Sequence, residues 1–249
     1  MSFCALILAG TRPGGDPLAR ELGVAHKGLI MVHGVPLLVR VAQGLRAAGA
    51  AQVLVACDEG PVAELARAHG CTVSLANRSG PSASVRDAFE ACGAPLVVTT
   101  VDHALLKPEW VRQLVDETPA DADVALMLAE RVKVEAALPG SKRTWLRFAD
   151  GQWSGCNLFY LNRGGASKAI DMWQGIEANR KRPWRIVIGL GFSTLLAYGR
   201  GRLSLAEGLA RLGKRIGISV SLVAAADGLA AVDVDKVSDL EDVRRLLAP

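Results

Sequence analysis

The chain has 249 residues, of which 50% are hydrophobic and 22% are charged, and its formal net charge is +4. This length suits one large α/β domain or two small ones, with enough apolar residues for a sizeable core. The mild positive charge fits a protein that handles anionic substrates. No block of Lys and Arg and no interleaving of basic with aromatic residues occurs, so we expect no nucleic-acid partner.

Cysteine usage and the N-terminal sequence predict a cytoplasmic protein. The cysteines have no CxxC or Cys/His spacing, so we expect free thiols in a reducing compartment; they are Cys4, Cys57, Cys71, Cys92 and Cys156. No basic segment precedes the short apolar run at the N-terminus, which argues against a signal peptide. The longest apolar stretch elsewhere, residues 186–198, is too short to span a bilayer.

The first part of the chain alternates short apolar runs with helical patterns. Strands are predicted at residues 3–9, 29–32, 52–56, 72–75 and 95–101. Helices are predicted from Pro36 up to Gly49 and at residues 61–69 and 82–91. Repeated strand–helix–strand order with short connections predicts an α/β fold with a parallel sheet covered on both faces.

The second part is less regular. A helix at 108–117 and a strand at 123–129 precede a polar, basic segment that contains Arg131, Lys133, Lys142 and Arg143. Asp150-Gly151, between apolar runs at 144–149 and 153–161, predicts a hairpin. The pattern from 164 to 215 is helical, and a strand at 217–223 and a helix at 239–247 close the chain. Without internal repeats or linkers, we predict a single domain over 1–249 with a helical insertion at 164–215.

The loop after the first strand has the composition of a phosphate-binding loop. It runs from Gly10 through Thr11-Arg12-Pro13-Gly14-Gly15-Asp16-Pro17, and Lys27 follows just before the next apolar run. Glycines let backbone N–H groups approach an anion, and Arg and Lys neutralise its charge. The loop matches neither Gly-x-x-x-x-Gly-Lys-Ser/Thr nor Gly-x-Gly-x-x-Gly, so an ordinary turn-rich crossover is the alternative. Asp16 is expected to order the loop or to pair with Arg12.

Three acids are candidate metal ligands. Asp102 ends a buried strand, the position where open α/β sheets bind ligands, although a helix cap or a turn is the alternative. Asp233 and Asp235 alternate along an extended stretch and therefore share one face. One of them could be a second ligand while the other caps a helix or faces solvent. Mg²⁺ suits such a site because it binds one or two carboxylates together with phosphate oxygens. His103 is interpreted as a turn residue, since Mg²⁺ disfavours imidazole.

Three further segments carry weaker signals. The loop at 77–85 follows a strand and opens a helix, so it could contact a nucleobase or ribose, with Ser82 as an N-cap being the alternative. Asn157, near Gly155, could reach the same cleft, or the glycine could mark a strand bulge. The basic, Trp-containing cluster at 180–185 could bind phosphate or contact a membrane surface peripherally, but a solvated helix junction is the more common explanation.

Several motifs together resemble one known family. They are Leu8-Ala9-Gly10, Lys27 before a strand, Gly34-x-Pro36-Leu37-Leu38, Gly80-Pro81, Val98-x-x-Val101-Asp102 and Asp233-Val-Asp235-x-x-x-Asp239-Leu240. The arrangement resembles MobA-like nucleotidyltransferases of the glycosyltransferase-A type, well over residues 1–130 and moderately over 217–247. The resemblance implies a three-layer α/β/α fold with a mostly parallel, mixed sheet. The opening loop departs from the family pattern, so either Arg12 or Arg20 would take the place of the family arginine.

The resemblance implies that Lys27 contacts phosphates and Asp102 binds Mg²⁺. We therefore predict a Mg²⁺-dependent transfer of NMP from an NTP, with CTP favoured over GTP, to a phosphorylated alcohol, polyol or sugar, with release of pyrophosphate. The alternatives are a glycosyltransferase of the same fold, which would usually carry Asp-x-Asp at the strand end, and a catalytically inactive nucleotide-binding protein.

This hypothesis assigns a role to each candidate residue. The catalytic residues are Lys27, Arg12 and Asp102, and the metal ligands are Asp102, Asp235 and Asp233. The nucleotide-binding residues are Leu8, Ala9, Gly10, Thr11, Arg12, Gly14, Gly15, Lys27, Asn77, Ser79, Gly80 and Ser84. The residues expected to contact the co-substrate are Asn157, Lys133 and Arg185.

Overall fold

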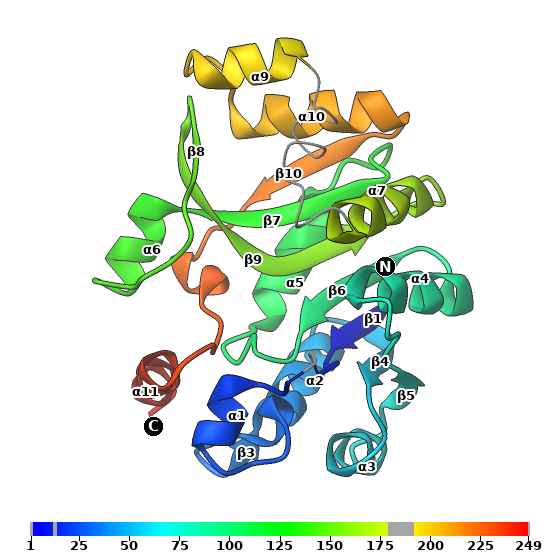
Figure 1. Cartoon of the computed structure of the whole chain (residues 1–249), viewed down its shortest axis with the longest axis vertical. Helices are drawn as coiled ribbons and strands as arrows, with labels where there is room; N and C mark the ends of the chain where they lie inside the picture. Colours follow the sequence, from blue (N-terminus) through cyan, green and yellow to red (C-terminus); the bar gives the residue numbers. More distant parts are fainter. Residues whose placement is uncertain (1, 12–13, 179–191, 249) are drawn as a thin grey trace.

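The structure is a computed structural model that describes residues 2–11, 14–178 and 192–248. Its centre is a mixed sheet with the strand order β10-β7-β9-β6-β1-β4-β5, and β8 pairs with β9. Helices cover both faces of this sheet (Figure 1). The predicted three-layer α/β fold with a mostly parallel, mixed sheet is therefore confirmed.

The elements of the first part follow the predicted order closely. In chain order they are β1 (Phe3–Leu8), α1 (Pro17–Glu21), the 3₁₀ turn η1 (Lys27–Leu29), β2 (Met31–Val32), β3 (Val35–Pro36), α2 (Leu37–Ala47), β4 (Ala50–Cys57), α3 (Pro61–Ala68), β5 (Thr72–Leu75), α4 (Pro81–Cys92) and β6 (Leu96–Thr100).

The second part contains the remaining elements. They are α5 (Pro108–Glu117), β7 (Val124–Glu130), α6 (Arg131–Ala137), β8 (Leu146–Phe148), β9 (Gly151–Leu161), α7 (Ala166–Ala178), α9 (Phe192–Gly199), α10 (Leu205–Ile216), β10 (Val220–Ala224), the 3₁₀ turn η2 (Gly228–Ala231) and α11 (Val237–Leu246). Helices α7, α9 and α10 thus lie in the stretch predicted as a helical insertion.

Strand direction places the carboxyl ends of most strands at one edge of the sheet. Strands β4 and β6 run parallel to β1, β5 runs parallel to β4, and β10 runs parallel to β7. Only β9 among these neighbours is reversed, and it pairs antiparallel with both β6 and β7. Thr99, near the carboxyl end of β6, pairs with Leu158 of β9. Because the two strands are antiparallel, the residues of β9 before Leu158 extend beyond the carboxyl end of β6.

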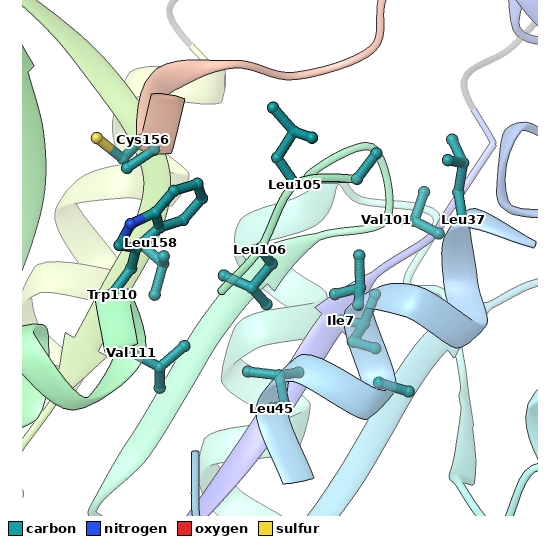
Figure 2. Packing of buried hydrophobic residues seen from close by; sticks show 14 of the residues in the cluster. Ile7, Leu37, Leu45, Val101, Leu105, Leu106, Trp110, Val111, Cys156 and Leu158 are labelled. Atoms are coloured by element: carbon teal, nitrogen blue, oxygen red, sulfur yellow. The ribbon is translucent and has the colours of Figure 1, made fainter. Parts of the chain in front are cut away.

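The core has one layer on each face of the sheet. Ala5 and Ile7 of β1 pack on one face with residues of α2, α3, α5, α6 and α11, and Leu6 packs on the other with α4 and α7. Figure 2 shows part of the first layer, with Ile7 of β1 near Leu45 of α2. Because successive residues of β1 are buried on opposite faces of the sheet, this strand reads as a continuous apolar run.

Some local predictions were wrong. Pro36 was predicted to begin a helix, but it ends β3 in an extended conformation and precedes α2. The hairpin at 150–151 does form, but Phe148 pairs with Gly151, so the turn lies one residue earlier. Helix α6 occupies the start of the polar, basic segment, for which no helix or strand was predicted, and Val134 is its one buried residue. In the described residues, no helix combines the length and hydrophobicity that crossing a membrane requires.

Candidate active site at the carboxyl edge of the sheet

Lys27 is the centre of the charged cluster at this edge. Its Nζ donates to Asp235 Oδ1 at 2.8 Å and to Asp102 Oδ2 at 3.1 Å, and Asp16 Oδ2 lies 3.6 Å away. The Lys27 side chain is only 8% exposed. Burial alone lowers the pKa of Lys27, but attraction and hydrogen bonds to Asp102 and Asp235 outweigh it, so the pKa is raised. Lys27 is therefore a fixed cation at pH 7.

The turn that carries Lys27 is held by its neighbours. His26 caps η1, because its Nδ1 accepts the Gly28 N–H, and its Nε2 lies 2.8 Å from the Ala9 carbonyl oxygen. A Cβ on Gly28 would lie 3.0 Å from Val101 Cγ2, so the turn packs tightly against the end of β6. The sequence hypothesis assigned no role to His26, because a lone histidine carries no signal of its own.

Asp102 is anchored on both its side chain and its backbone. The Thr100 hydroxyl donates to Asp102 Oδ1, which leaves Oδ2 toward Lys27. The Asp102 carbonyl accepts the Val234 N–H at 3.0 Å, which ties the end of β6 to the segment before α11. This backbone bond explains how two acids 133 positions apart in the chain, Asp102 and Asp235, come to share one lysine.

The two acids before α11 have different partners. Asp235 contacts Lys27 and is 66% exposed, so it faces the open side of the cluster. Asp233 instead accepts a hydrogen bond from Asn157 Nδ2 at 3.1 Å and one from Arg143. Asp239 caps α11 by accepting from the backbone N–H groups of Asp235 and Lys236. The structure thus groups Asp235, rather than Asp233, with Asp102 and Lys27.

Asn157 and Arg143 form a second polar group beside the acids. Across β7 and β9, Leu126 pairs with Phe159 and Leu128 with Gly155, so β9 carries a two-residue bulge there. Asn157 lies in this bulge with φ +49°, a conformation that Asn tolerates better than most residues. The Arg143 side chain is 9% exposed, and burial lowers its pKa despite the surrounding acids. Arg143 was only part of a basic segment in the sequence, because nothing there indicated its contact with Asp233.

The opening loop lies next to this cluster. Asp16 caps α1 by accepting a 3.0 Å hydrogen bond from the Ala19 N–H, and it also faces Lys27. It therefore orders the loop, which is one of the two roles expected for it. Gly14 and Gly15 both have positive φ, +92° and +77°, which explains the glycine pair. A Cβ on Gly10 would lie 3.2 Å from Ala76 Cβ, so the loop touches the segment after β5.

Of the loop predicted at 77–85, residues 81–85 belong to α4, and the rest is tied to that helix. The Asn77 N–H donates to Ser84 Oγ, and the Asn77 side chain binds Asp87 and the Ser79 N–H. Gly80, rather than Ser82, precedes the helix as its cap residue, and the buried Ser82 hydroxyl donates to Glu177 of α7. The interpretation of Ser82 as an N-cap was therefore wrong.

Some predicted residues are placed elsewhere. Lys133 Nζ donates to the Ala225 carbonyl at 3.0 Å and lies 3.8 Å from Glu130, and no described contact joins it to Lys27 or Asp102. Arg12 and Arg185 lie outside the described residues, as does the basic cluster at 180–185. Arg20, the alternative to Arg12, is exposed at the end of α1.

The composition of the cluster fits a hard divalent cation. In the described part of the chain, no group of three or more His, Cys, Asp or Glu side chains is arranged to hold a metal. Asp102 and Asp235 nevertheless provide two carboxylates close to each other, both in contact with the Lys27 ammonium. Two carboxylates suffice for Mg²⁺, which completes its shell with water and substrate phosphates.

The sequence profile that describes the MobA-like NTP transferase domain matches residues 5–155, more than half of the chain. The chain belongs to the MobA-like NTP transferase family. The match includes Lys27 and Asp102 but ends before Asn157, Asp233 and Asp235, which only the structure brings to the site.

Two sequence relatives support the family assignment. A 3-deoxy-manno-octulosonate cytidylyltransferase from Rhodospirillum rubrum is 31% identical over 163 residues. That match spans 61% of this chain and 60% of the relative's own length. A solved structure described as a hypothetical transferase from Thermus thermophilus is 30% identical, with a TM-score of 0.82, and the alignment covers 96% of this chain and 100% of that one.

A third similarity concerns the fold alone. The structure of CMP:2-keto-3-deoxy-manno-octonic acid synthetase complexed with CTP has a TM-score of 0.59 at 20% identity, covering 100% of this chain and 99% of that one. At this identity the likeness concerns the fold alone.

Proposed function

We propose that this chain is a Mg²⁺-dependent nucleotidyltransferase that transfers NMP from an NTP to a small anionic acceptor, releasing pyrophosphate. The observation that carries the proposal is the Lys27 ammonium held between Asp102 and Asp235 beside a glycine-rich loop. Transfer between two anions needs alignment and charge neutralisation more than a dedicated base. Two cations at the carboxyl edge of the sheet, the Lys27 ammonium and Mg²⁺, suit that task.

In this proposal the two halves of the sheet divide the substrates. Strands β1, β4 and β5 lie on one side of β6, and the loops after β1 and β5 touch at Gly10 and Ala76. These loops are assigned to the NTP. Strand β9 lies on the other side of β6, where Asn157 and Arg143 meet Asp233. This second group is assigned to the acceptor, and Arg143 is a better candidate there than Lys133.

The chain's residues then have the following roles. The acceptor oxygen attacks the α-phosphorus, and the bond from that phosphorus to the bridging oxygen of the β-phosphate breaks. Lys27 binds phosphate oxygens and offsets the negative charge that builds up on the leaving pyrophosphate. Asp102 and Asp235 would hold Mg²⁺, which supplies further neutralisation of the triphosphate when bound. The loop that follows β1 contributes backbone N–H groups.

CTP is the preferred nucleotide in this proposal, with GTP as the second choice. The supporting observation is the 31% identical relative, which is named as a cytidylyltransferase. The same name includes a sugar acid, so the acceptors to be tested are phosphorylated alcohols, polyols and sugars together with 3-deoxy-manno-octulosonate. Glycosyl transfer is a weaker alternative, because the chain belongs to an NTP transferase family and the strand end reads Val101-Asp102-His103.

The test is a matrix of reactions. Purified protein is incubated with Mg²⁺, each of the four NTPs and each acceptor, and pyrophosphate release is measured. We expect release with CTP and at least one acceptor. Saturable nucleotide binding without release from any pair would instead favour a catalytically inactive nucleotide-binding protein.

A further inference from the structure

His26 joins the opening loop to the turn that carries Lys27. Its side chain is buried, and each ring nitrogen has a backbone partner on a different segment. Nδ1 lies 2.9 Å from the Gly28 nitrogen, within the turn, and Nε2 lies 2.8 Å from the Ala9 carbonyl oxygen, at the start of the loop after β1. One imidazole thus spans two segments that are 17 residues apart.

The partners of His26 determine its protonation. The Gly28 N–H can only donate, so Nδ1 has to be an unprotonated acceptor. The Ala9 carbonyl can only accept, so the single ring proton is on Nε2. The ring is therefore neutral, and both of its hydrogen bonds have a fixed direction. Burial lowers the pKa of His26 in agreement with this state, against the opposing effects of the Ala9 carbonyl, Asp16 and Asp58.

The turn that His26 caps has little freedom to move. A Cβ on Gly28 would lie 3.1 Å from His26 Nδ1 and 3.0 Å from Val101 Cγ2, so the imidazole and β6 pack closely around the glycine. Lys27 lies between these two restrained residues. Its ammonium position consequently depends on the hydrogen bond that fixes the imidazole to Ala9.

We propose that His26 is a positioning residue for Lys27, which fixes the Lys27 turn to the Ala9 carbonyl so that the ammonium and the opening loop face one triphosphate. This inference rests on the proposed function and extends it to a residue outside the reacting groups. Its effect on the nucleotide is exerted through Lys27, and this dependence separates it from a general contribution to stability.

The test is a double-mutant cycle on nucleotide affinity. An Asn side chain at position 26 can still accept the N–H two residues on, but it cannot reach Ala9, so His26→Asn removes the link alone. CTP binding with Mg²⁺ is measured by calorimetry for the wild type, His26→Asn, Lys27→Ala and the double variant. His69→Asn, at an exposed histidine after α3, is the matched control, and thermal unfolding of each variant checks its fold.

The expected result is a specific pattern of coupling. His26→Asn should weaken CTP binding about five- to tenfold, the effect of one buried hydrogen bond, and His69→Asn should leave it unchanged. In the Lys27→Ala background, His26→Asn should change the affinity by less than about twofold. If His26→Asn does not fold, His26→Ser takes its place in the same cycle, because a Ser hydroxyl can still accept the Gly28 N–H but is too short to reach Ala9.

Three results would contradict the inference. The first is unchanged CTP affinity in His26→Asn. The second is an equal loss of affinity from His26→Asn in the wild type and in Lys27→Ala. The third is an equal loss of affinity in the control His69→Asn. A wild-type protein that binds none of the four NTPs contradicts the proposed function first and this inference with it. The two failures are therefore distinguishable in one experiment.

Discussion

Asp235 and Asp233 have the same chemistry but different partners, so the structure separates their roles. Asp235 shares the Lys27 ammonium with Asp102, whereas Asp233 holds Arg143 and Asn157. Their alternation along an extended segment indicated that both face the same side, but not which contacts they make. That choice depends on the bulge in β9, which brings Asn157 to Asp233. Gly155 indicated a bulge as one alternative, but not which contacts the bulge would make.

The substitution Asp235→Asn should therefore change the Mg²⁺ concentration that the reaction requires. We expect Asp235→Asn to raise the Mg²⁺ concentration for half-maximal rate at least about tenfold, and Asp102→Asn to cut the rate on the order of a hundredfold. Asp233→Asn should leave the Mg²⁺ requirement within about threefold and raise the KM of the acceptor. Glu241→Gln, at an exposed acid on α11, is the control. The rate of each of the four variants is measured as a function of Mg²⁺ concentration and of acceptor concentration. Equal Mg²⁺ requirements in the Asp233 and Asp235 variants would contradict the assignment.

His103 gives the fold a pH dependence of known sign. It is fully buried and stacks on Trp110 at a centroid distance of 5.8 Å. Burial lowers the pKa of His103 from 6.5 to about 4. Below pH 6.5 the unfolded chain therefore takes up a proton that the folded chain does not, and stability falls as the pH drops toward 4.

The expected loss of stability from His103 is on the order of 3 kcal/mol between pH 6.5 and 4. His26, whose pKa is also lowered, adds a loss of the same sign. His103→Phe retains an aromatic ring against Trp110 without a titrating group. Urea unfolding across this pH range should show a flatter slope for the variant than for the wild type, and identical slopes would rule His103 out as the source.

At the scale of elements, α7 is fastened to the helix that follows the predicted base-binding loop. Glu177 of α7 accepts a hydrogen bond from the buried Ser82 of α4, and Asp171 pairs with Arg86 at 2.5 Å. A Cβ on Gly80 would lie 2.7 Å from Glu177 Oε2, so the carboxylate packs on the cap residue of α4. The sequence predicted both helices but could not reveal this contact, because its two partners are 95 residues apart.

Removing one partner of this contact should cost more than removing both. Glu177→Ala leaves the Ser82 hydroxyl buried without an acceptor, so we expect a loss of about 1–3 kcal/mol in the free energy of unfolding. Adding Ser82→Ala to that variant should recover part of this loss, because the unpaired buried hydroxyl is then gone. Guanidinium unfolding of both single variants and the double variant measures the cycle. Strictly additive losses would show that the contact contributes nothing.

At the scale of the whole molecule, the sequence predicted most strands and helices within a few residues. The reason is that β1, β4, β6 and β7 are buried on both faces, which gives unmistakable apolar runs. The order of strands was harder to foresee. The reversed strand β9 pairs with both β6 and β7, and this placement brings Asn157 to Asp233.

This topology also predicts how ligands should stabilise the fold. The cluster joins Lys27, near the start of the chain, to Asp102 in the middle and Asp235 near the end, so a ligand held there restrains all three regions. Binding to the native state alone at about a hundred times Kd contributes about 2.7 kcal/mol. For a chain of this size that corresponds to a rise in Tm of about 5–10 °C.

We therefore expect CTP with Mg²⁺ to raise the Tm by this amount, as measured by calorimetry, and CTP with EDTA to raise it by less than half as much. The difference between the two conditions isolates the metal's contribution, because the carboxylates of Asp102 and Asp235 repel a triphosphate that arrives without a cation. Asp102→Asn should abolish most of that difference, whereas Glu241→Gln should preserve it. An equal shift with Mg²⁺ and with EDTA would show that nucleotide binding does not use these acids, and it would place the metal elsewhere.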